Sequence, residues 1–281
     1  MIDIHRARGW EAGAAESLWT DTFGDEAAFQ EEFYRLCTPE WPLVLTRDGA
    51  LCAMLAGMLE LPLVLADGRR LRAGYGYALA TRPDCRGQGF GAMLMDAMAE
   101  LARGHGLDCV ISVPAQPSLF RYFAGCGYRA GFYRGEKTVA PGAAPAAPAV
   151  PVAPAEYAAL REELLAGTAH TAYTGQQLDF QRLLCPHPGS GLYRLELVHG
   201  PGCAAVENWP GAPVVKELLC APEDMEQGGL ACAALCGRSV QVRFPAGAAD
   251  GQPFAAILWL EGAPPSCRGA ARDGWMGLAF D

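Results

Sequence analysis

The segment from Ala80 to Met95, ATRPDCRGQGFGAMLM, places an arginine and three alternate glycines between a predicted strand and a predicted amphipathic helix. Glycine lets a backbone come close to a ligand, and the start of a helix presents unpaired N–H groups and the positive end of the helix dipole. Arg86, directly before Gly87, adds a forked cation that suits phosphate oxygens. The segment therefore predicts a site for a phosphate or pyrophosphate group.

A dinucleotide-binding loop, a Walker A loop and a glycine-rich turn without a ligand are three possible interpretations of this segment. Gly87-x-Gly89-x-x-Ala92 matches the loose dinucleotide-binding fingerprint, but that fold needs an early parallel strand and an acid closing the next strand. Here three predicted strands come first, and Asp108 precedes the next strand. No Gly-Lys-Ser/Thr is present, which excludes a Walker A loop. A glycine-rich turn without a ligand is the structural alternative.

The more specific interpretation is a family resemblance. Arg86-Gly-Gln-Gly89-Phe-Gly91 resembles the Arg/Gln-x-x-Gly-x-Gly/Ala motif of the GCN5-related N-acetyltransferase (GNAT) superfamily. The stretch from Tyr77 to Arg86 is similar to the family's fourth strand running into its pyrophosphate loop. The stretch from Ser118 to Tyr128 is similar to the later short helix, which Gly-Phe/Tyr closes. The resemblance covers residues 1–137.

The resemblance implies that acetyl-CoA, or another acyl-CoA, is the cosubstrate and lies across a splayed strand. Backbone groups of Leu79, Ala80 and Thr81 would pair with its pantetheine arm. An amine of the acceptor would attack the thioester directly, and the protein would mainly orient the two partners. The implied residues of the pyrophosphate loop are Arg86, Gly87, Gln88, Gly89, Phe90, Gly91 and Ala92.

The sequence departs from the family at the expected general acid. The residue four before the closing glycine is usually a tyrosine, whereas here it is Phe123, with Tyr122 beside it. Neighbouring helical residues point about 100° apart, so Tyr122 is a candidate acid only with a local shift, and a packing role is the alternative. Candidates for the general base are Glu60, which a salt bridge could occupy instead, and the C-terminal carboxylate of Asp281, because some multi-domain relatives use their chain end in that way.

Composition narrows the class of protein. The chain has 281 residues, is 51% hydrophobic and carries a formal net charge of -9. This balance disfavours a general nucleic-acid binder, which needs a basic face. No apolar run reaches the length of a membrane helix, and the N-terminus has no apolar signal core. We therefore expect a cytoplasmic protein with neither nucleic acid nor membrane as a partner.

Eleven cysteines are scattered through the chain, which fits reduced, buried thiols. Cys232 and Cys236 lie one helical turn apart, but no histidine follows at the spacing of a zinc site. We expect no metal.

The residues between Ala140 and Ala155, APGAAPAAPAVPVAPA, predict an extended linker because repeated proline blocks both helices and strand pairing. The predicted organisation is a GNAT domain at 1–139, a linker at 140–155 and a second domain at 156–281. The expected fold is mixed α/β (α+β), with a mostly antiparallel sheet flanked by helices. Expected strands lie at 2–5, 41–46, 51–59, 75–81, 109–113, 128–133, 193–198, 204–209, 214–220, 240–244, 255–260 and 275–280. Expected helices lie at 10–23, 26–36, 90–105, 118–124, 156–165, 175–185 and 223–236.

The same order of strands and helix in both halves indicates an internal duplication. Pro83 corresponds to Pro222, but Arg86 corresponds to Met225. Acidic residues surround the second turn, where they stabilise the helix dipole and would repel a pyrophosphate. We therefore expect the second domain to be a degenerate copy that completes the first sheet or roofs the acceptor pocket.

Charge also differs along the first half. Residues 1–48 hold four basic and ten acidic side chains, whereas residues 81–137 hold seven basic and five acidic ones. This split suits an anionic cosubstrate and a cationic acceptor, namely a primary amine of a small molecule or a protein. A non-catalytic acyl-CoA-binding regulatory module is the alternative function.

Overall fold

The computed structural model describes residues 1–38, 42–143, 146–263, 265–271 and 273–280. These residues form two compact units, and each unit is assembled from three separate segments of the chain. Unit 1 consists of Met1–Pro62, Leu71–Ala130 and Ala255–Arg268. Unit 2 consists of Leu63–Arg70, Gly131–Phe254 and Gly269–Asp281. Each unit has its own core and is described separately.

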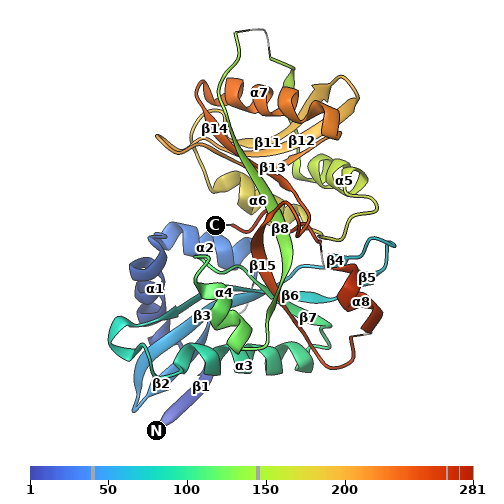
Figure 1. Cartoon of the computed structure of the whole chain (residues 1–281). Helices are drawn as coiled ribbons and strands as arrows, with labels where there is room; N and C mark the ends of the chain where they lie inside the picture. The colour runs from blue at the N-terminus through green and yellow to red at the C-terminus, as the bar shows by residue number, and fades with distance from the viewer. Residues whose placement is uncertain (39–41, 144–145, 264, 272, 281) are drawn as a thin grey trace. The chain divides into compact units, whose positions relative to one another are not determined.

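Unit 1 is built on a mixed sheet in the order β1-β2-β3-β6-β7-β15 (Figure 1). Neighbouring strands are antiparallel except β6 and β7, which run parallel across the helical connection between them. A parallel pair needs such a crossover, whereas a tight turn can join an antiparallel pair. The strands are β1 (Ile2–Arg6), β2 (Leu43–Arg47), β3 (Ala50–Glu60), β6 (Ala73–Thr81), β7 (Cys109–Ser112) and β15 (Gln252–Trp259).

Helices pack on unit 1's sheet through apolar side chains that alternate along the strands. Trp19 of α1 (Gly9–Phe23) and Phe33 of α2 (Ala27–Leu36) contact Tyr77 of β6, and the Phe33 and Tyr77 rings stack 4.7 Å apart. Met95 and Met98 of α3 (Phe90–Gly104) share a second core with Leu55 of β3. Phe123 of α4 (Leu119–Gly125) joins this second core, and α8 (Pro265–Ala270) follows β15.

In unit 2 the larger set of paired strands follows the order β8-β14-β13-β12-β11-β9. Only β13 and β14 among these neighbours are parallel in the pairs of the described residues. The strands are β8 (Arg129–Val139), β9 (Ala149–Pro151), β11 (Gly191–Leu197), β12 (Gly200–Glu207), β13 (Val214–Leu219) and β14 (Val240–Pro245). A smaller sheet joins β10 (His170–Thr171), β4 (Leu63–Val64) and β5 (Arg70–Leu71).

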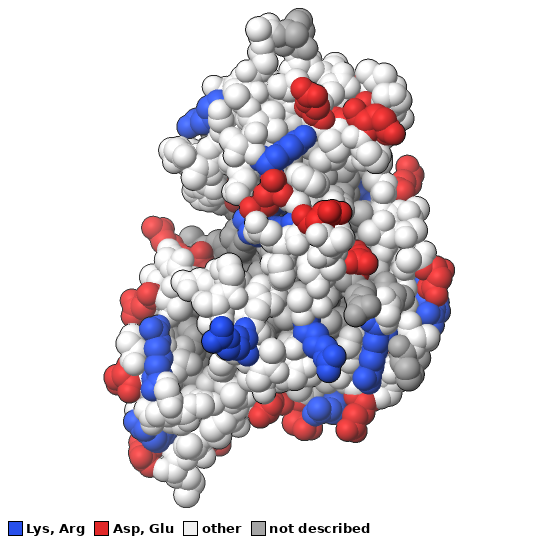
Figure 2. Space-filling view, viewed as in Figure 1, with Lys and Arg blue, Asp and Glu red and all other residues white. Residues whose placement is uncertain are grey.

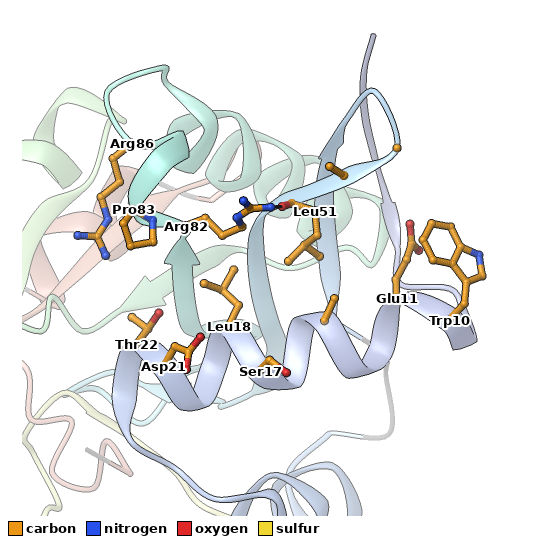
Figure 3. A pocket seen from close by; sticks show the side chains of 13 residues that line it. Trp10, Glu11, Ser17, Leu18, Asp21, Thr22, Leu51, Arg82, Pro83 and Arg86 are labelled. Atoms are coloured by element: carbon orange, nitrogen blue, oxygen red, sulfur yellow. Dashed lines mark hydrogen bonds between the residues drawn. The ribbon is translucent and has the colours of Figure 1, made fainter.

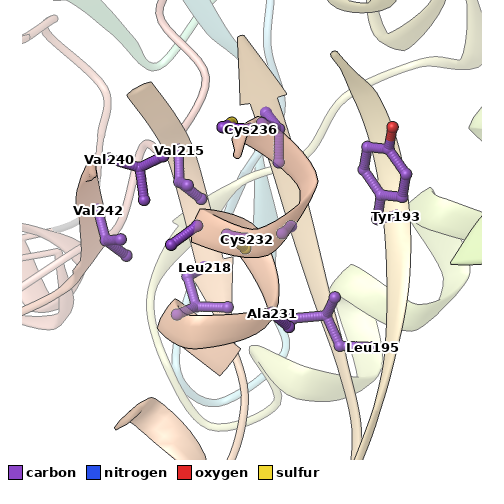
Figure 4. Packing of buried hydrophobic residues seen from close by; sticks show 12 residues of the cluster. Tyr193, Leu195, Val215, Leu218, Ala231, Cys232, Cys236, Val240 and Val242 are labelled. Carbon is purple, nitrogen blue, oxygen red and sulfur yellow. The ribbon is translucent and has the colours of Figure 1, made fainter. Parts of the chain in front are cut away.

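The core of unit 2 lies between its larger sheet and α7 (Met225–Cys236). Figure 4 shows Cys232 of this helix on the side of Leu218 of β13 and Ala231 beside Leu195 of β11. Cys232 is fully buried, which confirms that it serves as a small core residue. Helix α5 (Pro154–Leu164) contacts β11 and β12 and packs on α6 (Gly175–Leu183).

The two units repeat one arrangement. In unit 1, β6 leads through the short 3₁₀ turn η1 (Pro83–Cys85) into α3 and then the parallel strand β7. In unit 2, β13 leads through η2 (Pro222–Asp224) into α7 and then the parallel strand β14. Pro83 and Pro222 begin the corresponding turns, as the duplication predicts. The mixed, mostly antiparallel fold flanked by helices is thereby confirmed.

Three expectations differ from the structure. Residues 275–280 do not form the expected strand, because side chains instead satisfy their backbone: Arg161, Thr171 and Tyr173 all donate to the Met276 carbonyl oxygen. The expected linker is partly ordered, since Ala149–Pro151 pairs with β11 at the sheet edge, where proline is tolerated.

The compact units also divide the chain elsewhere than at 140–155, because β15 pairs with β7 and so brings Ala255–Arg268 into unit 1. None of the helices in the described residues has the length and apolar character needed to cross a membrane.

Candidate active site

The glycine-rich segment forms the turn between β6 and α3. Gly87 and Gly89 adopt left-handed backbone conformations with φ of 76° and 80°, which a residue with a side chain would adopt only under strain. The first helical bond near the turn runs from the Met93 N–H to the Gly89 carbonyl oxygen at 3.1 Å. The N–H groups of Phe90, Gly91 and Ala92 therefore come before the first helical bond and remain open to a ligand.

Arg86 is exposed at the start of this turn. Its Nε donates to the Thr81 carbonyl oxygen at 3.2 Å, which fixes the base of the side chain. Within the described part of the chain its terminal nitrogens make no hydrogen bond or ion pair. A cation with free donors thus stands beside the N-terminus of α3, as the sequence predicts for an anion site.

Strand β6 parts from β7 before it reaches the turn. Only Ala73–Gly76 of β6 pairs with Cys109–Ser112 of β7, whereas β6 keeps its ladder with β3 as far as Thr81. Ala78 has a φ of 54°, so the backbone twists just beyond the last pair with β7. Leu79, Ala80 and Thr81 therefore lie on a strand whose edge toward β7 is open.

Two residues near the turn were not predicted from the sequence. Ala78 adopts a left-handed conformation although it is not a glycine, and no residue type marks that position. Arg47, on β2, donates a hydrogen bond to Gln88 and lies 5.6 Å from the centre of the Phe90 ring. This side-chain hydrogen bond joins residues 41 positions apart in sequence, so local spacing does not reveal it.

The candidate acid Tyr122 lies close to the turn. A methyl group built on Gly91 would stand 2.6 Å from Tyr122 Oη and 3.6 Å from Thr81 Oγ1. Burial, together with nearby Cys126 and Asp96, raises the pKa of Tyr122 to about 12. Phe123, at the position where the family usually has tyrosine, is buried instead, with its ring centre 5.5 Å from that of Tyr128.

The candidate base Glu60 does not lie at this turn. Glu60 is exposed and forms an ion pair of 3.0 Å with Arg72. It pairs with Gly74, which is seven residues from Thr81 along β6 and thus about 23 Å away at ~3.3 Å per residue. Asp281 lies outside the described residues.

A cavity of about 590 Å³ lies in unit 1 on the other side of the turn (Figure 3). Asp21 and Leu18 of α1 face Arg82 and Arg86 across it. Arg82 is held by Asp84, at 2.7 Å, and by the Leu51 carbonyl oxygen, at 2.9 Å. The cavity is therefore lined by acidic, basic and apolar side chains.

The surroundings of the turn do not favour catalysis by a cysteine nucleophile or by a metal ion. Burial, with Cys52 alongside, raises the pKa of the Cys85 thiol to about 11, so this thiol is protonated at neutral pH and is a poor nucleophile. No group of three histidine, cysteine or acidic side chains in the described ranges is arranged to hold a metal ion. On the face shown in Figure 2, basic and acidic side chains are interspersed.

The corresponding turn of unit 2 has different chemistry. Asp224 occupies its end and accepts hydrogen bonds from the backbone N–H and Nδ1 of His199, at 2.9 and 2.8 Å. The helix α7 then begins directly at Met225, and Glu226 lies in its first turn. An acidic turn without a left-handed glycine does not offer the anion site that unit 1 has.

Comparisons with known proteins agree with this geometry. The sequence model of the acetyltransferase (GNAT) family matches residues 5–128. No curated protein matches the chain in sequence.

Solved structures share its fold along most of its length. A probable N-acyltransferase of unknown function from Enterococcus faecalis V583 is 14% identical, with a TM-score of 0.68, and the match covers 93% of this chain and 73% of that one. A GCN5-related N-acetyltransferase from Anabaena variabilis is 13% identical, with a TM-score of 0.66, over 92% and 72% of the two chains. For Eis1 from Mycobacterium abscessus the values are 14%, 0.61, 92% and 73%. Residues 5–128 thus match the acetyltransferase (GNAT) family model, and the solved structures share the fold of the chain.

Proposed function

We propose that this protein transfers an acetyl, or another acyl, group from its CoA thioester to a primary amine. The observation that carries the proposal is the continuity between the open edge of β6 at Tyr77–Thr81 and the N–H groups at the start of α3. An extended pantetheine arm contains amides that can pair with an open strand edge. The pyrophosphate that follows it suits the helix start and Arg86.

The reaction requires orientation more than a reactive side chain. The amine nitrogen attacks the thioester carbonyl carbon, the C–N bond forms, and the C–S bond breaks with release of the CoA thiolate. An ammonium acceptor must first lose a proton to a base or to water. A thiol with an ordinary pKa of ~8.5 leaves as a thiolate without obligatory protonation, so Phe123 at the acid position does not prevent transfer.

The acceptor that fits best is a cationic amine, on either a small molecule or a protein. Residues 1–48, which include α1 and α2, carry four basic and ten acidic side chains. Such an excess of acidic groups raises the local concentration of cations.

A second function, a non-catalytic acyl-CoA-binding regulatory module, is favoured by two observations. Phe123 is buried at the position of the usual acid, and the Glu60 carboxylate is engaged in an ion pair with Arg72. Neither residue would be needed for binding alone. The two functions share the cosubstrate and differ only in turnover.

Calorimetric titration of the whole chain with acetyl-CoA tests the binding of the cosubstrate, which both functions require. We expect one site per chain, because only unit 1 has the glycine turn and the free arginine among the described residues. Two sites would contradict the degenerate second turn, and selective binding of NAD over CoA would support a dinucleotide site instead.

Release of free thiol from acetyl-CoA then separates the two functions. The acceptors would be polyamines, aminoglycosides and peptides with a free amino group, each measured against a reaction without amine. Amine-dependent thiol release supports the transferase. Tight binding of acetyl-CoA with no release for any amine supports the regulatory module.

A further inference from the structure

Neighbouring rings of α4 point in different directions. Tyr122 is 40% exposed, whereas Phe123 is 7% exposed and packs into the core with Met95 and Tyr128. The two rings lie 5.9 Å apart at an interplanar angle of 86°. The hydroxyl of Tyr122 therefore does not take the place that a tyrosine at position 123 would occupy.

The Tyr122 hydroxyl instead lies over the first turn of α3. Gly91 is the second residue of this helix, and its would-be Cβ is only 2.6 Å from Tyr122 Oη. Cys126, one helical turn further along, lies near the same hydroxyl and contributes to its raised pKa. The hydroxyl thus sits beside the open N–H groups that precede Met93.

The thioester end and the diphosphate end of the cosubstrate site lie at different positions along β6. Thr81, whose Oγ1 is 3.6 Å from the same built methyl group, is three residues beyond Ala78, where the strand has parted from β7. Three residues of strand span about 10 Å. Tyr122 Oη is therefore at the diphosphate end of the arm, far from the thioester end.

We propose that Tyr122 donates a hydrogen bond to a diphosphate oxygen of the acyl-CoA and is a binding residue, not the acid that protonates the leaving thiolate. This inference rests on the proposed function. A neutral phenol is a donor that adds to the backbone N–H groups without adding charge. Hydrogen bonds to charged groups are among the stronger ones in proteins.

The test combines Tyr122→Phe with two thioesters, acetyl-CoA and S-acetylpantetheine, which lacks the diphosphate together with the adenosine 3′-phosphate. For acetyl-CoA we expect the variant to raise the Kd and KM about tenfold with little change in kcat. For S-acetylpantetheine we expect kcat/KM to be the same in the variant and the wild type. Leu119→Ala, an exposed position on the same helix, is the matched control and should change neither thioester.

Three other results would contradict the inference or the proposed function. A fall in kcat for both thioesters, with an altered alkaline limb of the pH–rate profile, would assign Tyr122 to proton transfer and overturn the inference. An unchanged Kd for acetyl-CoA in the variant would also overturn it. If wild-type protein does not bind acetyl-CoA at all, the proposed function itself fails, and calorimetry alone shows this before any variant is made.

Discussion

Arg161 and Glu217 form a buried ion pair in unit 2, with Nε of the arginine 2.9 Å from Oε1 of the glutamate and side chains 1% and 0% exposed. Tyr157 Oη also donates to Oε1, at 2.9 Å, and Trp275 Nε1 donates to Oε2, at 2.6 Å. Both carboxylate oxygens are therefore satisfied. Arg161 also donates to the Met276 carbonyl oxygen, so the pair fastens the C-terminal segment to the core.

Glu217→Ala should lower the free energy of unfolding by about 3–5 kcal/mol, because it leaves the buried Arg161 charge with only the 4.0 Å contact to Glu162. Urea denaturation measures this loss. Glu196→Ala is the matched control, since Glu196 pairs with Arg194 at the surface and such pairs contribute ~0–1 kcal/mol. Equal losses in the two variants would contradict the structural role given to the buried pair.

Gly277→Ala should be more destabilising than Gly211→Ala. Both glycines have left-handed backbones, with φ of 73° and 84°, so each substitution carries a strain of about 1–2 kcal/mol. Only at Gly277 would the new methyl group collide with the Glu217 carboxylate, whereas nothing lies within 4 Å at Gly211. Overpacking of this kind adds about 1–3 kcal/mol, and a comparison of the two melting curves measures the difference.

Arg86→Glu should weaken acetyl-CoA binding at least tenfold, which corresponds to about 1.4 kcal/mol, because it replaces a free cation beside the start of α3 with an anion. Calorimetry measures the Kd. Arg103→Glu is the control, because Arg103 lies in the last turn of the same helix and pairs with Glu100. An unchanged Kd for acetyl-CoA in Arg86→Glu would contradict the assignment of the pyrophosphate to this turn.

The pair of His199 and Asp224 should show a defined pH dependence. The hydrogen bond and charge of Asp224 raise the pKa of His199 above 6.5. Burial raises the pKa of Asp224, but the bonds from His199 outweigh it and bring that pKa below 3.8. The histidine's contribution to stability is complete below pH 6.5 and is lost as the pH rises through its raised pKa.

The aspartate's contribution is complete above pH 3.8 and is lost as the pH falls through its lowered pKa. The pair therefore stabilises the fold most between these two values. Titration of the His199 ring protons by NMR should give a pKa above 6.5 that returns toward 6.5 in Asp224→Asn. A wild-type value at or below 6.5 would disagree with the hydrogen bond.

The local chemistry of the turn could be predicted from sequence because it depends on residues close together in the chain. Left-handed conformations at Gly87 and Gly89 follow from residue type, and so does the helix that starts at Phe90. The repeated order of strand, turn, helix and strand was likewise readable from apolar spacing. Strand pairing between β7 and β15 was not, because it joins segments almost 150 residues apart, and spacing carries no information on such pairs.

Features that depend on side chains meeting in space were also missed or wrong. The segment from Trp275 to Phe280 has the apolar composition of a strand, yet Arg161, Thr171 and Tyr173 satisfy the Met276 carbonyl oxygen in place of a neighbouring strand. Ala78 adopts a positive φ that its residue type does not favour, so only the surrounding fold can impose it. The approach of Tyr122 to Gly91 depends on how α4 packs on α3, which helical periodicity alone does not give.

The interleaving of segments between the two units affects how the chain can reach its native state during synthesis. Strand β7 gains its partner β15 only after residues 255–268 have been made, although most of unit 1 lies before residue 131. While the intervening chain emerges, the edge of β7 that β15 later covers is without that partner. A nascent chain halted before residue 255 would therefore present an unpaired strand edge, the kind of surface that chaperones recognise and that favours aggregation.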